Sequence, residues 1–143
     1  MTQDFTTEVT EVAEVVAAVS GIGAAPATPQ ENINDRVFAL TYLMTNETAI
    51  SETGTMQHLL TIAVDILTPH TTLHLNIATL LPILDLVVTA FITEITTVSA
   101  FFDGSIDTYE ILRVEFLPFY PYSGVECVGY RVILENVKQK INL

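Results

Sequence analysis

The most apolar run in the chain, LNIATLLPILDLVVTAFI at residues 75–92, constrains the fold more than any other segment. A run of this length suits either a membrane span or a helix packed in a protein core. Asn76, Pro82 and Asp85 interrupt the run, and its apolar side chains favour particular sides of a helix. We therefore expect a packed helix over residues 72–93 and no association with a membrane.

This helix carries one broad apolar stripe that keeps its phase across Pro82, which predicts a single kinked helix with the proline turned away from the stripe. The stripe consists of Leu73, Ile77, Leu80, Leu81, Leu84, Val88 and Phe91. A second apolar line, off the stripe, consists of Leu75, Ile83, Leu86 and Ala90. A helix that is apolar on two sides is normally covered on two sides. The sheet of the same domain would cover one side, and either the first helix or another subunit would cover the other.

The remaining segments predict one more helix and four strands. Apolar residues at helical spacing predict a helix over residues 5–20, and alternating or largely apolar runs predict strands over 36–44, 55–67, 109–117 and 124–137. Residues 45–54 read as a polar connection, and 101–110 read as a loop built on Asp-Gly. The order helix, strand, strand, helix, strand, strand predicts one α+β domain over residues 1–143. Its sheet would be four-stranded and mainly antiparallel, with both helices on one face.

The segment FLPFYPYSGVECVGY at residues 116–130 reads as the tip of the last hairpin. Phe119, Tyr120 and Tyr122 stand where a plain turn carries Asn, Asp or Ser. Exposed aromatic side chains bury much area at low entropic cost when a partner docks. We expect these three rings to form a contact surface; the alternative is that they fold back onto the sheet edge.

Charge and composition exclude some functions. The formal net charge is −12 with five Lys and Arg in total, whereas sequence-independent nucleic-acid binding depends on basic side chains. The first residues, MTQDFTTEVTEVAEVV, contain four acids and no basic region, so no secretory signal is expected. Half of the residues are hydrophobic, which indicates either a rich core or apolar surface reserved for a partner.

No group of residues predicts catalysis, a metal site or a cofactor site. His58 falls on the apolar face of its strand, and His70 and His74 are spaced as a metal pair, but His70 directly follows a proline before the helix. Cys127 lies within a strand, without an adjacent histidine base. The carboxylates of one Gly-containing loop lack the spacing of a calcium loop; they are Asp103, Asp107 and Glu110. We expect a protein that is not an enzyme.

The succession TGTMQHLLTIAVDIL, LHLNIATLLPILDLVVTAF, FDGSIDTYEILRVEF and YSGVECVGYRVILENVKQK resembles the tail terminator proteins of long-tailed bacteriophages. The resemblance covers residues 36–143 and extends to the N-terminal helix and its Pro-containing connector. It implies a small α+β domain of the virion, assembled in the host cytoplasm into a hexameric ring. It also implies that the ring caps the head-proximal end of the tail tube, stops polymerisation, docks the head-side connector and lets DNA through its lumen.

Three other functions remain as alternatives. Another head–tail joining or neck protein of the same virion would share this geometry and composition. A small-molecule binding module would hold a buried polar cluster between helix and sheet, where His58 is the one clear candidate. An enzyme would need His58, Cys127 and the carboxylates around Asp103 to converge in space.

Overall fold

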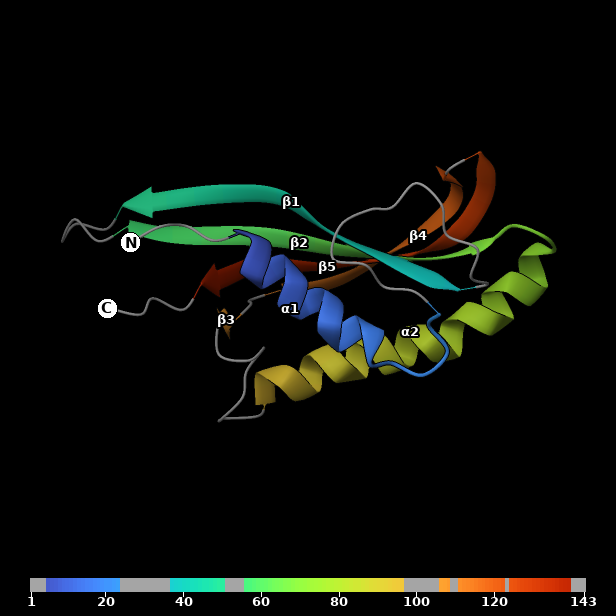
Figure 1. The fold of residues 1–143 in the computed structure, drawn as a ribbon, viewed down its shortest axis with the longest axis horizontal. Coiled ribbons are helices and arrows are strands. Elements are labelled where there is room, and N and C mark those ends of the chain that lie inside the picture. The colour runs from blue at the N-terminus through green and yellow to red at the C-terminus, as the bar shows by residue number, and fades with distance from the viewer. Residues whose placement is uncertain are drawn as a thin grey trace.

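The structure is a computed structural model that describes residues 5–23, 37–50, 56–96, 106–108, 111–122 and 124–139. Two helices pack against an antiparallel sheet (Figure 1). The elements in chain order are α1 (Phe5–Ala17), β1 (Phe38–Ile50), β2 (Met56–Pro69), α2 (Leu73–Thr96), β3 (Ile106–Thr108), β4 (Ile111–Tyr122) and β5 (Val125–Gln139). The predicted α+β class, the order of the main elements and the position of both helices on one face are confirmed.

The sheet has the order β1-β2-β5, and its fourth position is shared by β4 and the short strand β3. β4 pairs with β5 from Ile111↔Glu135 to Tyr122↔Val125. β3 continues along the same edge of β5 and meets Lys138 and Gln139. Every pairing is antiparallel. The loop expected over residues 101–110 therefore contributes one short strand to the predicted four-stranded sheet.

The main core lies between the sheet and the helices. α1 lies over β1, whereas α2 lies across β2 and β5. Successive side chains of a strand point to opposite faces, so every second residue of β2 from Leu60 to Ile66 faces the helices and is buried. α1 contributes Val9, Val12 and Val16, and the turn after it contributes Val19. α2 contributes Leu80, Ile83, Leu84, Val87 and Phe91.

The face of the sheet turned away from both helices, called the far face below, carries a second apolar cluster. Its buried members are Phe38, Leu40, Leu67 and Cys127, and Leu117, Tyr120 and Tyr122 pack against them. The rings of Phe38 on β1 and Tyr122 on β4 have centroids 5.5 Å apart. A flat sheet would place these strands about 14 Å apart, because three strand spacings separate them. The sheet therefore curls toward the far face at the end where β4 and β5 meet (Figure 1).

Two strands are longer than predicted. β1 continues through Ile50, across residues expected to form a polar connection, and pairs with β2 as far as Ile50↔Met56. Its polar residues from Thr45 to Glu47 are exposed, which suits an edge strand. β4 continues through Tyr122, so the expected hairpin tip is a strand; Pro118 and Pro121 are tolerated there because the edge of a sheet does not require every N–H.

Candidate functional site

The surface of α2 that faces away from the sheet is rich in large apolar side chains. Among the residues the structure describes, those exposed on this helix are Leu73, Leu75, Leu81, Leu86 and Ile92, between 44% and 60% of each being accessible. Their polar neighbours on the same surface include Asp85 and Thr89. The part of this surface made by Leu75, Leu81, Leu86 and Ile92 is called the outer α2 surface below. Leu75 and Leu86 form one exposed line along the helix and Leu81 and Ile92 form another, with the two polar residues between the lines. Exposed apolar residues in this number on a small acidic chain indicate a contact surface.

The second apolar line predicted for this helix is divided by the fold. Leu75 and Leu86 are exposed, but Ile83 is buried in the core and Ala90 is partly buried. A Cβ on Gly21, just after α1, would lie 3.0 Å from Cγ1 of Ile83. The end of the first helical segment therefore covers Ile83, and this residue is not available to a second subunit as the sequence had suggested.

The outer strip of the sheet formed by β4 is only partly covered on its helix side. Val114 and Phe116 are opposite Val132 and Tyr130 of β5, so they point to the same side of the sheet as the helices. They remain 40% and 44% exposed, although α2 packs against the neighbouring strand β5. Phe116 packs against the Tyr130 ring at 5.3 Å between centroids. Together Val114, Phe116 and Tyr130 form what is called the β4 strip below.

The three aromatic residues predicted to form a contact surface behave differently from one another. Phe119 is 64% exposed, the highest value among the large apolar residues described. Tyr120 and Tyr122 fold back against the far-face cluster, as the alternative interpretation had it. The cause is a bulge: Pro118 and Phe119 oppose the single residue Val128 between the pairs at Leu117 and Tyr120. The extra residue reverses the alternation, and both tyrosines turn to the far face.

One end of the molecule gathers exposed apolar residues from two elements. The backbone N–H of His70, just after β2, donates to the Glu126 carbonyl at 2.8 Å. This bond ties the start of α2 to the start of β5, so Leu73 and Leu75 lie at the same end as Phe119 and Val125 (Figure 1). All four of these side chains are exposed, and they are called the hairpin end below.

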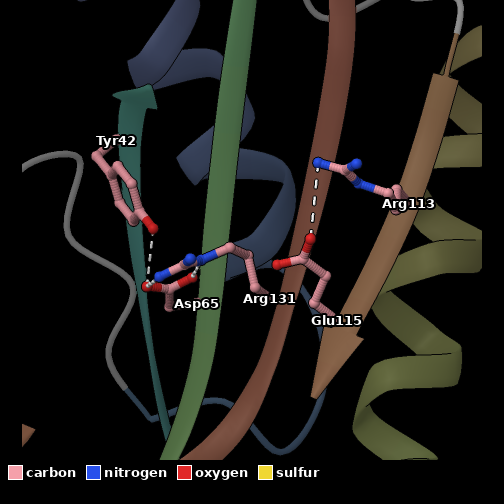
Figure 2. A network of polar contacts seen from close by, with 5 residues as sticks. All are labelled: Tyr42, Asp65, Arg113, Glu115 and Arg131. Carbon is pink, nitrogen blue, oxygen red and sulfur yellow. Dashed lines mark hydrogen bonds and ion pairs between the residues drawn. The ribbon is translucent and has the colours of Figure 1, made fainter. Parts of the chain in front are cut away.

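A buried polar network crosses the far face. Asp65 of β2 is fully buried, and its carboxylate accepts hydrogen bonds from Arg131 Nε at 2.8 Å and Nη2 at 3.2 Å. The Tyr42 hydroxyl donates to the same carboxylate at 3.0 Å, and the Arg131 guanidinium lies 5.9 Å from the centre of the Tyr42 ring. Figure 2 shows this group on the side of the sheet opposite the helices, beside the exposed pair of Arg113 and Glu115.

The fourth strand joins the same network through Tyr120. Burial raises the pKa of Tyr120 to about 12, and the negative charge of Asp65 and a hydrogen bond to it act in the same direction. Burial and Asp65 also raise the pKa of Tyr42, and the hydrogen bond to Asp65 raises the pKa of Arg131. Both phenols thus stay protonated donors and the guanidinium stays charged. With one residue from each of β1, β2, β5 and β4, this arrangement anchors strands rather than activating a substrate.

Of the residues considered for chemistry, the structure describes the side chains of His70, His74 and Cys127. His70 and His74 are exposed near the start of α2, and the side chain of His58 lies outside the described residues, as do those of Asp103, Asp107 and Glu110. Cys127 is buried, and burial raises the pKa of its thiol, which lowers the nucleophilic thiolate fraction. In the described part of the chain no three His, Cys, Asp or Glu residues are placed to hold a metal ion.

The sequence did not predict the Asp65 network. The alternation of side chains along β2 and β5 predicts Asp65 and Arg131 on the polar, solvent-facing sides of their strands, where isolated charges are ordinary. A signal was present, since two opposite charges occur at the centres of two otherwise apolar strands. Such a pair fits adjacent positions on neighbouring strands, and the register places Asp65 directly opposite Arg131.

Residues Leu73–Glu94 of α2 are long and apolar enough to cross a membrane by length and composition, and 33% of the most apolar window is buried inside the molecule. In the structure the same helix packs Leu80, Val87 and Phe91 against the sheet. The apolar character of α2 thus divides into a side that belongs to the core and the outer α2 surface.

Comparison with known proteins assigns no family: no protein-family model matches the chain, and no curated protein matches it. The function is therefore argued from the surfaces described above, together with the order of segments in the sequence.

Proposed function

We propose that the chain is a structural virion protein, a tail terminator that assembles with copies of itself into a ring. The ring caps the head-proximal end of the tail tube, stops tube polymerisation and docks the head-side connector, while DNA passes through its lumen. The observation that carries the proposal is the outer α2 surface. A helix that buries one side in its own core and still exposes Leu75, Leu81, Leu86 and Ile92 has a second side that assembly would cover.

The placement of the open surfaces supports a ring. A subunit of a closed ring meets its two neighbours through two different surfaces. The sheet order puts β1, with exposed Met44, at one side of the molecule and the β4 strip at the other. The hairpin end, with Phe119 and Val125, lies where β4 ends and β5 begins, and it supplies a third surface at one end of the strands (Figure 1). That surface is free for the tube or the connector when both sides are occupied by neighbours.

The charges support a lumen that does not hold DNA. The net charge is −12, and the guanidinium groups of Arg113 and Arg131 are paired with carboxylates, Arg113 with Glu135 at 3.0 Å and Arg131 with Asp65 at 2.8 Å. Phosphate binding requires basic groups that are free to displace counterions. An acidic ring would repel the DNA backbone and let it slide.

The test is the size of the purified full-length chain in solution, measured by light scattering after size exclusion at low and high salt, with negative-stain imaging of any large species. We expect hexameric rings that persist at high salt, because apolar contacts are not screened. Purified tail tubes should then bind the chain at one end and stop growing. A strict monomer that also leaves tube growth unchanged would refute the proposal, and rings that bind the connector but not tubes would indicate another neck protein.

A further inference from the structure

β4 consists of two halves that are held in different ways. From Ile111 to Leu117 the strand pairs with β5 residue by residue. Beyond the bulge, pairing resumes at only three positions, Tyr120, Pro121 and Tyr122. The ladder therefore contributes little to holding the last five residues of the strand. No described strand lies on the outer side of β4.

Side chains hold this second half instead, and they reach across the far face to other strands. Tyr120 packs against the far-face cluster, and its hydroxyl is hydrogen-bonded to Asp65 of β2. The Tyr122 ring lies against Phe38 of β1 with centroids 5.5 Å apart. Beneath these rings lie Cys127, which is 1% exposed, and the buried Leu67. The contacts that close this part of the sheet are thus few, local and separate from the main core.

We infer that residues 118–122 form a flap that opens and closes over Cys127 while the rest of the sheet stays folded. The Tyr120–Asp65 and Tyr122–Phe38 contacts hold this flap closed. The bulge after Leu117 is the hinge, because it interrupts the ladder at one point. Segments with few buried contacts and weak backbone pairing open at lower free energy than the whole molecule.

The flap carries Phe119, the most exposed aromatic residue of the hairpin end. A partner that docks on Phe119 therefore binds a movable element and holds it in one position. The docking of a partner on Phe119 rests on the proposed function, whereas the flap itself does not.

Cys127 makes the flap measurable, because it is the one cysteine of the chain and lies under Tyr120. The experiment follows the reaction of the folded full-length protein with Ellman's reagent at mildly alkaline pH. Tyr120→Phe keeps the ring and removes the hydroxyl that contacts Asp65. The loss of one hydrogen bond to a charged group should make the labelling of Cys127 about tenfold faster. Tyr130→Phe makes the same chemical change on the helix side of the sheet and should leave the rate unchanged.

A series of urea concentrations separates the flap from global unfolding. Labelling through the flap should depend weakly on urea in the folded range, because little surface is exposed by a local opening. The inference is overturned if wild-type labelling follows the full urea dependence of unfolding, or if Tyr120→Phe and Tyr130→Phe label equally fast. Added tail tubes should slow the labelling; unchanged labelling in the presence of tubes, with the urea result intact, would overturn the docking step and leave the flap standing.

Discussion

At the scale of single residues, Asp65 is the most informative position in the molecule. A buried carboxylate costs several kcal/mol to desolvate unless charged and hydrogen-bonding partners offset the loss. Asp65 has both, since Arg131 binds it through two nitrogens and Tyr42 donates a third hydrogen bond. Its neighbours in the far-face cluster are apolar, and apolar side chains can pack together in several ways. The directional bonds of Asp65 favour one of these arrangements.

Asp65→Asn should destabilise the fold strongly. The substitution keeps the shape of the side chain but leaves the Arg131 charge without a counterion. We expect a loss of about 3 kcal/mol in the free energy of unfolding, at the lower end of the range for breaking a buried pair, because the Arg131 side chain retains 23% exposure. Urea denaturation followed by circular dichroism measures this value. The control is Glu115→Gln, which changes an exposed pair with Arg113 and should cost under about 1 kcal/mol; equal losses would contradict the assigned role.

Alkaline pH should weaken the fold through Tyr120 and Tyr42. In the folded state the pKa of Tyr120 is about 12 and that of Tyr42 is also raised, whereas an unfolded tyrosine titrates near pH 10. Between those values the unfolded chain binds fewer protons than the folded one, so the free energy of unfolding falls as pH rises. Ultraviolet titration should show two of the five tyrosines ionising last. If all ionise together while the protein is still folded, the Asp65 network does not hold these hydroxyls.

At the scale of elements, the central pair β2 and β5 organises the molecule. Both strands are paired on two sides, and they carry the buried apolar residues on the helix side and Asp65 and Arg131 on the far face. Gly129 lies in the middle of β5, between Leu67 of β2 and Leu117 of β4. α2, by contrast, continues through Pro82, which is exposed, as its phase predicted. Close packing is therefore concentrated in the two central strands.

Gly129→Ala should disturb these two strands. An added Cβ would clash with the backbone oxygen of Ile66, so the strands must separate, and overpacking of this kind costs about 3 kcal/mol. Gly124→Ala is the control, because nothing lies within 4 Å of its Cβ and only its φ of +80° opposes the change, at about 1 kcal/mol. Thermal unfolding of both variants gives the comparison. A smaller loss for Gly129→Ala than for Gly124→Ala would show that the strand spacing adapts freely.

At the scale of the whole molecule, the two helices do not cover all the apolar surface that the chain presents. They bury the helix side of β1, β2 and β5, but the β4 strip and the outer α2 surface stay open. Exposed apolar residues are normal when scattered, whereas here they gather on one helix, one sheet edge and one end. This distribution is what a subunit with several neighbours requires.

A pair of charge substitutions on α2 separates assembly from folding. Leu86 is 49% exposed and Ile83 is 8% exposed. Leu86→Glu should keep the helix content of the monomer and abolish the ring, because a charge would be buried at the contact. Ile83→Glu should unfold the chain itself, because the same charge would enter the core against Gly21. Circular dichroism and light scattering report the two effects. Intact rings in Leu86→Glu would remove α2 from the interface.

The class of the fold and the position of its main elements could be predicted from the pattern of apolar side chains along the chain. Periods of about 3.6 and of two residues identified both helices and all four main strands, because the side that faces the core must be apolar along each element. The continuity of α2 through Pro82 followed from the same phase. No comparable signal marked residues 45–50, which continue β1 along the edge of the sheet, because pairing with β2 rather than composition makes them a strand.

Which apolar and charged residues are buried could not be predicted from these periods. Ile83 and Leu86 both belong to the predicted second apolar line of α2. The end of the first helical segment covers Ile83 and leaves Leu86 exposed. The bulge in β4 turned Tyr120 and Tyr122 inward and left Phe119 outside. Asp65 became a buried charge because the strand register put Arg131 opposite it. Periodicity defines the faces of each element, but contacts between elements distant in sequence decide which of those faces are covered.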